Sequence, residues 1–200
     1  MDPARKELRL PAVWHPGRFQ GWRARLLGTA GHHLLSWEKG RSASYALLTT
    51  AVDDRAVYDA LVKIGACPGN ALIRAAWDRR RDPADPAPDV RVQGAPLRIS
   101  LIWSGQSDPV PLGHLIEDPG EKGFDFRFGG HEDLIDAWNS GCVVCLYSCP
   151  GGKIGNAAYT IRDQVGRATR FRIRKDSFPP DETPVTVVIR LMDVPSDHDH

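Results

Sequence analysis

The sequence lacks long apolar runs and a strong excess of either charge. No stretch approaches the ~18 apolar residues of a membrane-spanning helix, and MDPARKELRLPAVW at the start has no apolar segment of a signal peptide. With 26 basic and 25 acidic residues, the net charge of +1 gives no electrostatic basis for binding nucleic acid. These absences predict a cytoplasmic protein without a transmembrane segment or nucleic-acid partner, or a periplasmic or envelope protein if a leader was removed.

The motifs of common enzyme classes are also missing. There is no Gly-x-Ser-x-Gly elbow, no His-Glu-x-x-His pair and no Gly-x-Gly-x-x-Gly helix start, and PGGKIGN at 150–156 lacks the spacing of a P-loop. A cysteine nucleophile beside His131 is the remaining enzymatic hypothesis, although the sequence positions no base for it. We therefore favour a non-enzymatic protein.

Cysteine is scarce, yet three of the four cysteines lie in one short segment, SGCVVCLYSCPGG at 140–152. Cys142, Cys145 and Cys149 follow the pattern C-x2-C-x3-C-P, which is a bacterial ferredoxin run without its first cysteine. One hypothesis makes these three the ligands of an iron-sulfur cluster or a zinc-like ion. Cys67 is then the first candidate for the fourth ligand, followed by His32, His33 or His131. The alternative is that they are buried thiols, or that two of them form a disulfide.

The residues around the cysteines favour a strand, and a regular strand separates the three thiols. Val143 and its neighbours prefer extended structure, so Cys145 and Cys149 would share a face but lie ~13 Å apart, with Cys142 on the opposite side. The same alternation sends the adjacent His32 and His33 to opposite faces, so we expect that they do not bind one ion together.

Elsewhere, hydrophobic periodicity predicts an α+β fold. The sheet is expected to be mixed or largely antiparallel, with two or three short helices packed against it in a single domain. We divide the chain into an irregular N-terminal arm at 1–22, the domain at 23–192 and a polar tail at 193–200. The expected strands lie within 33–50 on either side of a turn at 39–40, and at 96–103, 110–117, 124–128, 169–175 and 185–192. The expected helices lie at 53–64, 71–81 and 131–139.

Several blocks of the sequence resemble the YdjY family of bacterial proteins. They are GHHLLSWEKG at 31–40, AVYDALVKIGACPGN at 56–70, DPADPAPDVRVQGAPL at 82–97, GFDFRFGGH at 123–131 and SGCVVCLYSCPGGKIGNAAYTIRD at 140–163. The resemblance implies no established activity. It implies that relatives are often exported or lipoproteins, and that some are named as ferredoxin-type proteins because of the cysteines.

We therefore expect an uncharacterised YdjY-like protein that binds a metal ion or iron-sulfur cluster through Cys142, Cys145 and Cys149. It would act in redox chemistry or metal binding, with another redox protein as its partner. The second hypothesis is a binding or interaction module of the cell envelope, with core thiols or one disulfide and no cofactor.

Overall fold

The computed structural model describes residues 1–26, 31–82, 84, 89–165, 170–174 and 179–193. Most of the strands are short, and only three of them reach eight residues. The strands are β1 (Glu7–Trp14), β2 (His33–Trp37), β3 (Leu48–Thr50), β4 (Pro96–Trp103), β5 (Val110–Pro111), β6 (Ile116–Glu117), β7 (Phe126–Phe128), β8 (Cys142–Cys145), β9 (Ile154–Asn156), β10 (Arg172–Ile173) and β11 (Pro184–Leu191).

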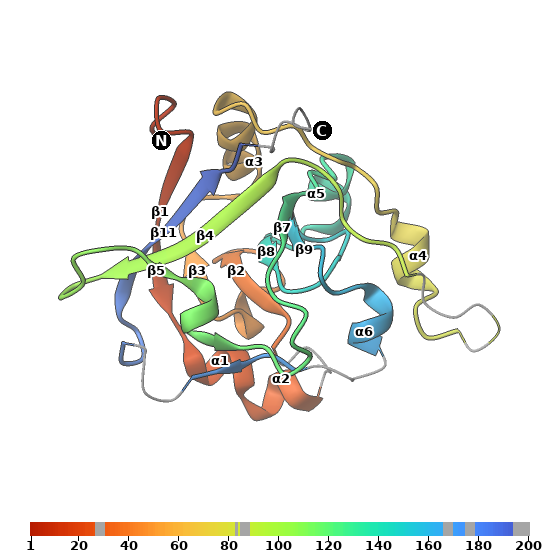
Figure 1. Ribbon diagram of the computed structural model, residues 1–200. Coiled ribbons are helices and arrows are strands. Elements are labelled where there is room, and N and C mark those ends of the chain that lie inside the picture. The colour runs from red at the N-terminus through yellow and green to blue at the C-terminus, as the bar shows by residue number, and fades with distance from the viewer. Residues whose placement is uncertain (27–30, 83, 85–88, 166–169, 175–178, 194–200) are drawn as a thin grey trace, which may run out of the picture.

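The helices are short and lie outside the sheet (Figure 1). They are α1 (Pro16–Gln20), α2 (Trp22–Leu26), α3 (Asp54–Lys63), α4 (Arg74–Asp78), α5 (Asp133–Trp138), α6 (Ile161–Val165) and the 3-10 turns Ala43–Tyr45 and Leu112–His114. The longest is α3, which the side chain of Asp53 caps by accepting the backbone N–H of Ala56 at 2.6 Å. Among the described residues, no helix has the length and apolar character needed to cross a membrane.

Eight strands close into a barrel in the order β11-β1-β3-β2-β8-β9-β7-β4, and β4 then pairs with β11. Closure depends on β11, which forms seven residue pairs with β1 on one side and seven with β4 on the other. Most neighbours are antiparallel, but β2 with β3 and β8 with β9 are parallel. The short β5 adds to β4 outside the ring (Figure 1).

The barrel explains where the core lies. An eight-stranded ring has an interior just wide enough to be filled by side chains, and one buried apolar cluster contains side chains from β1, β4, β8 and β11. Along β4, Leu97, Ile99 and Leu101 are buried, as the period of two predicts. The predicted α+β class is nevertheless wrong, because periodicity identifies a half-buried strand but not its partners, and here the edges of the sheet pair with each other.

Two further expectations need correction. Residues 7–14, which we expected within an irregular arm, form β1, whose buried and exposed residues largely alternate despite Pro11. Of the strand expected at 169–175, the described residues 170–174 form only the short β10, which pairs with β6, and residues 169 and 175 lie outside the described part. The expected tail also lies outside the described residues, apart from Asp193.

Candidate metal centre

A β-bulge in β8 turns Cys142 and Cys145 toward each other. In the pairing of β2 with β8, Leu35 lies opposite Val144 but Ser36 lies opposite Cys142, so β8 contains one extra residue at Val143. An extra residue shifts the alternation of side chains by one. Two cysteines three positions apart therefore share a face, and their sulfurs lie 3.5 Å apart. The expectation that Cys142 lies on the opposite face from Cys145 is wrong for this reason.

Cys149 reaches the same place because the chain turns back after β8. Since β8 and β9 are parallel neighbours, the loop at 146–153 must return along β8 before β9 can start. Hydrogen bonds fix this return: the N–H of Lys153 donates to the carbonyl of Cys142 at 3.3 Å, and Ser140 Oγ donates to the carbonyl of Gly151 at 2.7 Å. The ~13 Å separation expected for Cys145 and Cys149 on a continuous strand does not apply.

His32 and His33 also face the cysteines together. Their rings are stacked, with centroids 4.4 Å apart and planes 21° from parallel. His32 precedes the first residue of β2, and a second bulge at Leu34 follows His33, so regular alternation does not hold here. The expectation that the two histidines point to opposite faces is wrong.

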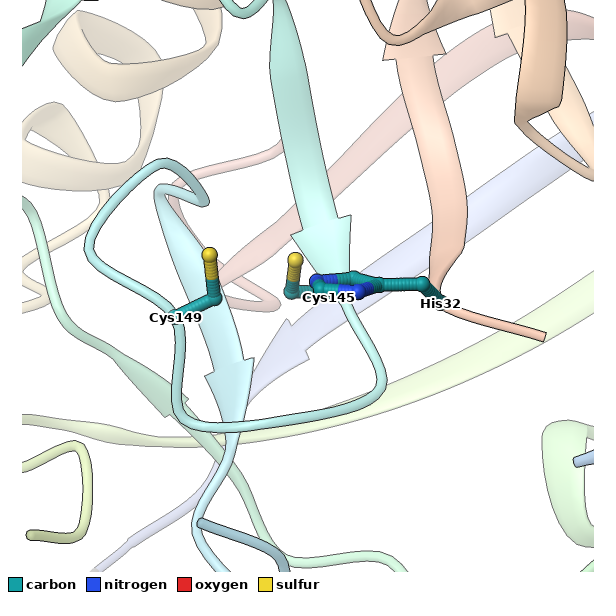
Figure 2. A group of neighbouring side chains, drawn as sticks. All are labelled: His32, Cys145 and Cys149. Atoms are coloured by element: carbon teal, nitrogen blue, oxygen red, sulfur yellow. The ribbon is translucent and has the colours of Figure 1, made fainter. Parts of the chain in front are cut away.

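The five side chains form two overlapping groups of three potential ligands, which we call trio A and trio B. Trio A is His32, Cys145 and Cys149, and trio B is His33, Cys142 and Cys145. Within each trio the ligand atoms lie within 4.8 Å of one another. In trio B, Nδ1 of His33 is 3.3 Å from the sulfur of Cys142 and 4.0 Å from that of Cys145. Figure 2 shows trio A, with Cys145 at the end of β8 and Cys149 in the loop that follows.

Cys145 is the central thiol and changes the acidity of the other two. Its hydrogen bond to Cys142, against the opposing effect of burial, lowers the pKa of Cys142 to about 5, and His33 contributes further lowering. The Cys145 thiol and the neighbouring His32 hold the pKa of Cys149 well below its usual value. The interactions with Cys142 and Cys149 raise the pKa of Cys145. Cys142 is therefore a thiolate at neutral pH, and the lowered pKa of Cys149 favours its thiolate as well; the thiolate is the ligand form of cysteine.

The two histidines titrate differently. Burial, with the neighbouring His33, lowers the pKa of His32, so its imidazole is neutral near pH 7. Burial also acts to lower the pKa of His33, but the charge and hydrogen bond of Cys142 outweigh it and raise the pKa. A neutral imidazole is the ligand form of histidine.

A cavity of about 380 Å³ lies against this cluster. His33, Cys142 and Cys149 contribute to its wall, as does the exposed Arg41. Trp77 of α4 also lines the cavity and packs against the three cysteines, which form a cluster separate from the main core. The cluster is therefore buried in protein yet adjoins a space that reaches the surface.

Of the residues considered as a fourth ligand, His32 and His33 each belong to one trio, whereas Cys67 and His131 lie outside both. Cys67 is exposed. His131 is buried, and its Nε2 accepts the backbone N–H of Leu72 at 3.2 Å, so this nitrogen has a structural role. All four cysteines are free thiols.

Comparisons with known proteins identify the family of the chain. A family model described as the YdjY domain matches residues 3–190. The chain belongs to the YdjY family. It is 29% identical over 168 residues to a protein of Escherichia coli (strain K12) named "Uncharacterized protein YdjY", an alignment that covers 84% of this chain and 70% of that protein. No solved structure matches the chain. YdjY membership confirms the resemblance seen in the sequence, and the function must be argued from the site.

Proposed function

We propose that this YdjY protein binds a soft transition-metal ion through Cys142, Cys145 and Cys149 with His32 or His33, and that it is not an enzyme. The strongest support for the proposal is that three sulfurs and two imidazoles converge, although they come from two segments over 100 residues apart. Within each trio the ligand atoms lie within 4.8 Å of one another.

The spacing of the sulfurs fits a shared metal ion. Two thiolates bound to one ion at about 2.3 Å lie roughly 3.8–4.0 Å apart at tetrahedral or trigonal angles. The sulfurs of Cys142 and Cys145 are already 3.5 Å apart, so binding requires a shift of only a few tenths of an ångström. Thiolate and imidazole ligands favour zinc, copper(I) and iron-sulfur centres over magnesium or calcium.

A [4Fe–4S] cluster fits the short distance less well than a directly bound ion. Each thiolate of such a cluster binds a different iron, and inorganic sulfide separates the irons, whereas a [2Fe–2S] cluster has two thiolates on each iron. The close approach of Cys142 and Cys145 therefore favours binding of one metal atom by both sulfurs.

The rival function is an interaction module whose thiols are structural or oxidised to a disulfide. It is supported by the same short distance between the sulfurs of Cys142 and Cys145. Alkylation of the native protein and mass measurement, with and without reductant, separates the two. A Cys142–Cys145 disulfide that persists in the purified protein and prevents metal uptake would favour the rival.

Cobalt(II) substitution tests the proposal directly. Reduced, metal-free protein should develop a thiolate-to-cobalt charge-transfer band on addition of Co²⁺. Cys142→Ser and Cys145→Ser should weaken this band, because each removes a sulfur ligand. Cys67→Ser is the matched control, since Cys67 is exposed and outside both trios. A wild-type protein without the band, or an equal loss in the control, would refute the proposal.

A further inference from the structure

The site contains more potential ligands than one ion requires. Zinc in proteins is almost always bound by four ligands, whereas five side chains meet here. They do not form one group of five, because Cys142 and Cys149 belong to different trios and only Cys145 belongs to both. Each trio supplies two sulfurs and one imidazole nitrogen.

The arrangement of the histidines matches two ions side by side. Protein sites that hold two metal ions place them about 3.5–4 Å apart. The rings of His32 and His33 lie nearly parallel, with centroids 4.4 Å apart, and each belongs to a different trio. Each imidazole can therefore bind its own ion, whereas two stacked rings on a single ion would have to diverge.

The ligand number and charge select the kind of ion. Each trio offers three ligands, which suits copper(I), a soft ion that thiolates select and that accepts three-coordinate binding. Two copper(I) ions with three thiolates have a net charge of −1, and Arg41 lines the adjoining cavity. Two zinc ions would leave each ion short of one ligand.

We infer that the site holds two copper(I) ions, one in trio A and one in trio B, with the Cys145 sulfur as a bridge between them. Cys145, and any protonated Cys149 or His33, loses its proton to solvent on binding, and the Cys145 sulfur then forms a bond to each ion. No electron is transferred, because copper enters and stays as copper(I). This inference rests on the proposed function and specifies its ion and stoichiometry.

Anaerobic titration of the reduced, metal-free protein with copper(I), in competition with a chromophoric copper(I) chelator, tests the inference. The wild type should bind two ions per chain. Cys149→Ser should keep one ion in trio B, and Cys142→Ser should keep one in trio A, while Cys145→Ser should lose tight binding of both. His114→Ala, which changes an exposed histidine far from the trios in sequence, should still bind two.

The outcomes separate the inference from the proposed function. No copper(I) uptake by the wild type would overturn both. Uptake of one ion that requires all three cysteines would overturn the two-ion site and leave the proposed function standing. Far-UV circular dichroism of the metal-free variants checks their folding, and His32→Ala gives a second test of trio A, with loss of one ion expected. A copper–copper distance below about 4 Å by X-ray absorption would support the bridge, and a longer separation in the two-ion form would refute it.

Discussion

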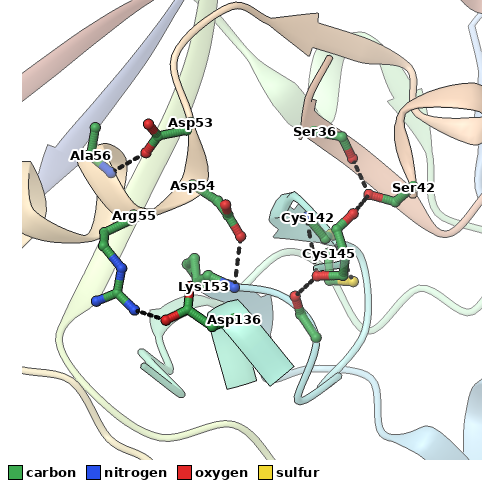
Figure 3. A network of polar contacts seen from close by, with 12 residues as sticks. Ser36, Ser42, Asp53, Asp54, Arg55, Ala56, Asp136, Cys142, Cys145 and Lys153 are labelled. Carbon is green, nitrogen blue, oxygen red and sulfur yellow. Dashed lines mark hydrogen bonds and ion pairs between the residues drawn. The ribbon is translucent and has the colours of Figure 1, made fainter. Parts of the chain in front are cut away.

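Replacing Lys153 by Met should destabilise the protein strongly, because Lys153 forms a buried ion pair. Its side chain is fully buried, and Nζ lies 3.0 Å from Oδ2 of Asp54, whose side chain is 6% exposed (Figure 3). Methionine keeps much of the apolar stem but leaves the carboxylate without its cation. Removing one partner of a buried pair costs about 3–5 kcal/mol, since an uncompensated charge stays buried. We expect a fall in the free energy of unfolding within that range.

The same substitution should weaken metal binding. Lys153 connects the loop at 146–153 to the start of α3 through Asp54, and its backbone N–H donates to the carbonyl of Cys142. Loss of the ion pair loosens the loop that holds Cys149 beside Cys145. The variant should therefore bind metal more weakly, even though none of its metal ligands has changed.

Urea unfolding of the metal-free protein measures the effect on stability. Arg55→Met is the matched control, because Arg55 lies next to Asp54 on α3 and pairs with Glu132 and Asp136 at the surface. Exposed ion pairs contribute little to the free energy of unfolding, so the control should unfold at nearly the same urea concentration as the wild type. The double variant Lys153→Met with Asp54→Leu should recover much of the loss. A decrease below about 1 kcal/mol for Lys153→Met would show that the pair is not a buried charge pair of the expected kind.

Three further predictions concern acidity and backbone packing. In the metal-free protein, thiolate absorbance should appear with a midpoint near the pKa of about 5 of Cys142, and Cys142→Ser should lack this transition; a first midpoint near 9 would contradict it. Gly141→Ala should lower stability by about 3 kcal/mol in urea unfolding, because a Cβ at φ +66° would lie 2.4 Å from the Cα of Gly40; wild-type stability would contradict the close packing. A hydrogen bond from Arg190 holds the pKa of Glu7 below 4.5, so its stabilisation is present above pH 4.5 and is lost as the pH falls through the lowered value. Urea unfolding should show Glu7→Gln less stable than wild type at pH 6, with the difference shrinking below pH 4.5; a constant difference would refute this.

Local patterns in the sequence predicted several helices and strands, because burial of one face makes apolar residues recur at the spacing typical of that element. The alternation at 96–103 predicted β4 with its buried Leu97 and Leu101, and the Asp53 cap predicted the start of α3. Closure of the barrel was not predictable in this way. It depends on which strands pair. The pairing of β11 with β1 joins opposite ends of the chain, and its pairing with β4 joins the last strand to the middle of the sequence.

The site, like the fold, was predictable where it depends on local sequence and not where it depends on strand pairing. The spacing of the cysteines pointed to the segment whose thiols the structure brings together, but strand alternation predicted diverging thiols. The bulge at Val143 and the parallel connection after Cys145 reverse that conclusion, and both depend on the partner strands. His32 and His33 were among the candidates for the fourth ligand, but strand alternation predicted that they point to opposite faces. The adjacent pair His32-His33 was the available signal, and only the bulge after it reveals that both rings face the cysteines.

X-ray absorption spectroscopy of the copper(I)-loaded protein tests the central claim most directly. The account predicts a first coordination shell dominated by sulfur at about 2.3 Å with a smaller nitrogen contribution. The wild type and Cys67→Ser should each bind two coppers per chain, whereas Cys142→Ser should keep only the copper of trio A, whose two sulfurs are unchanged. A first shell of nitrogen and oxygen alone, or the same copper content in Cys142→Ser as in Cys67→Ser, would contradict the assignment of Cys142, Cys145 and Cys149 as the metal ligands.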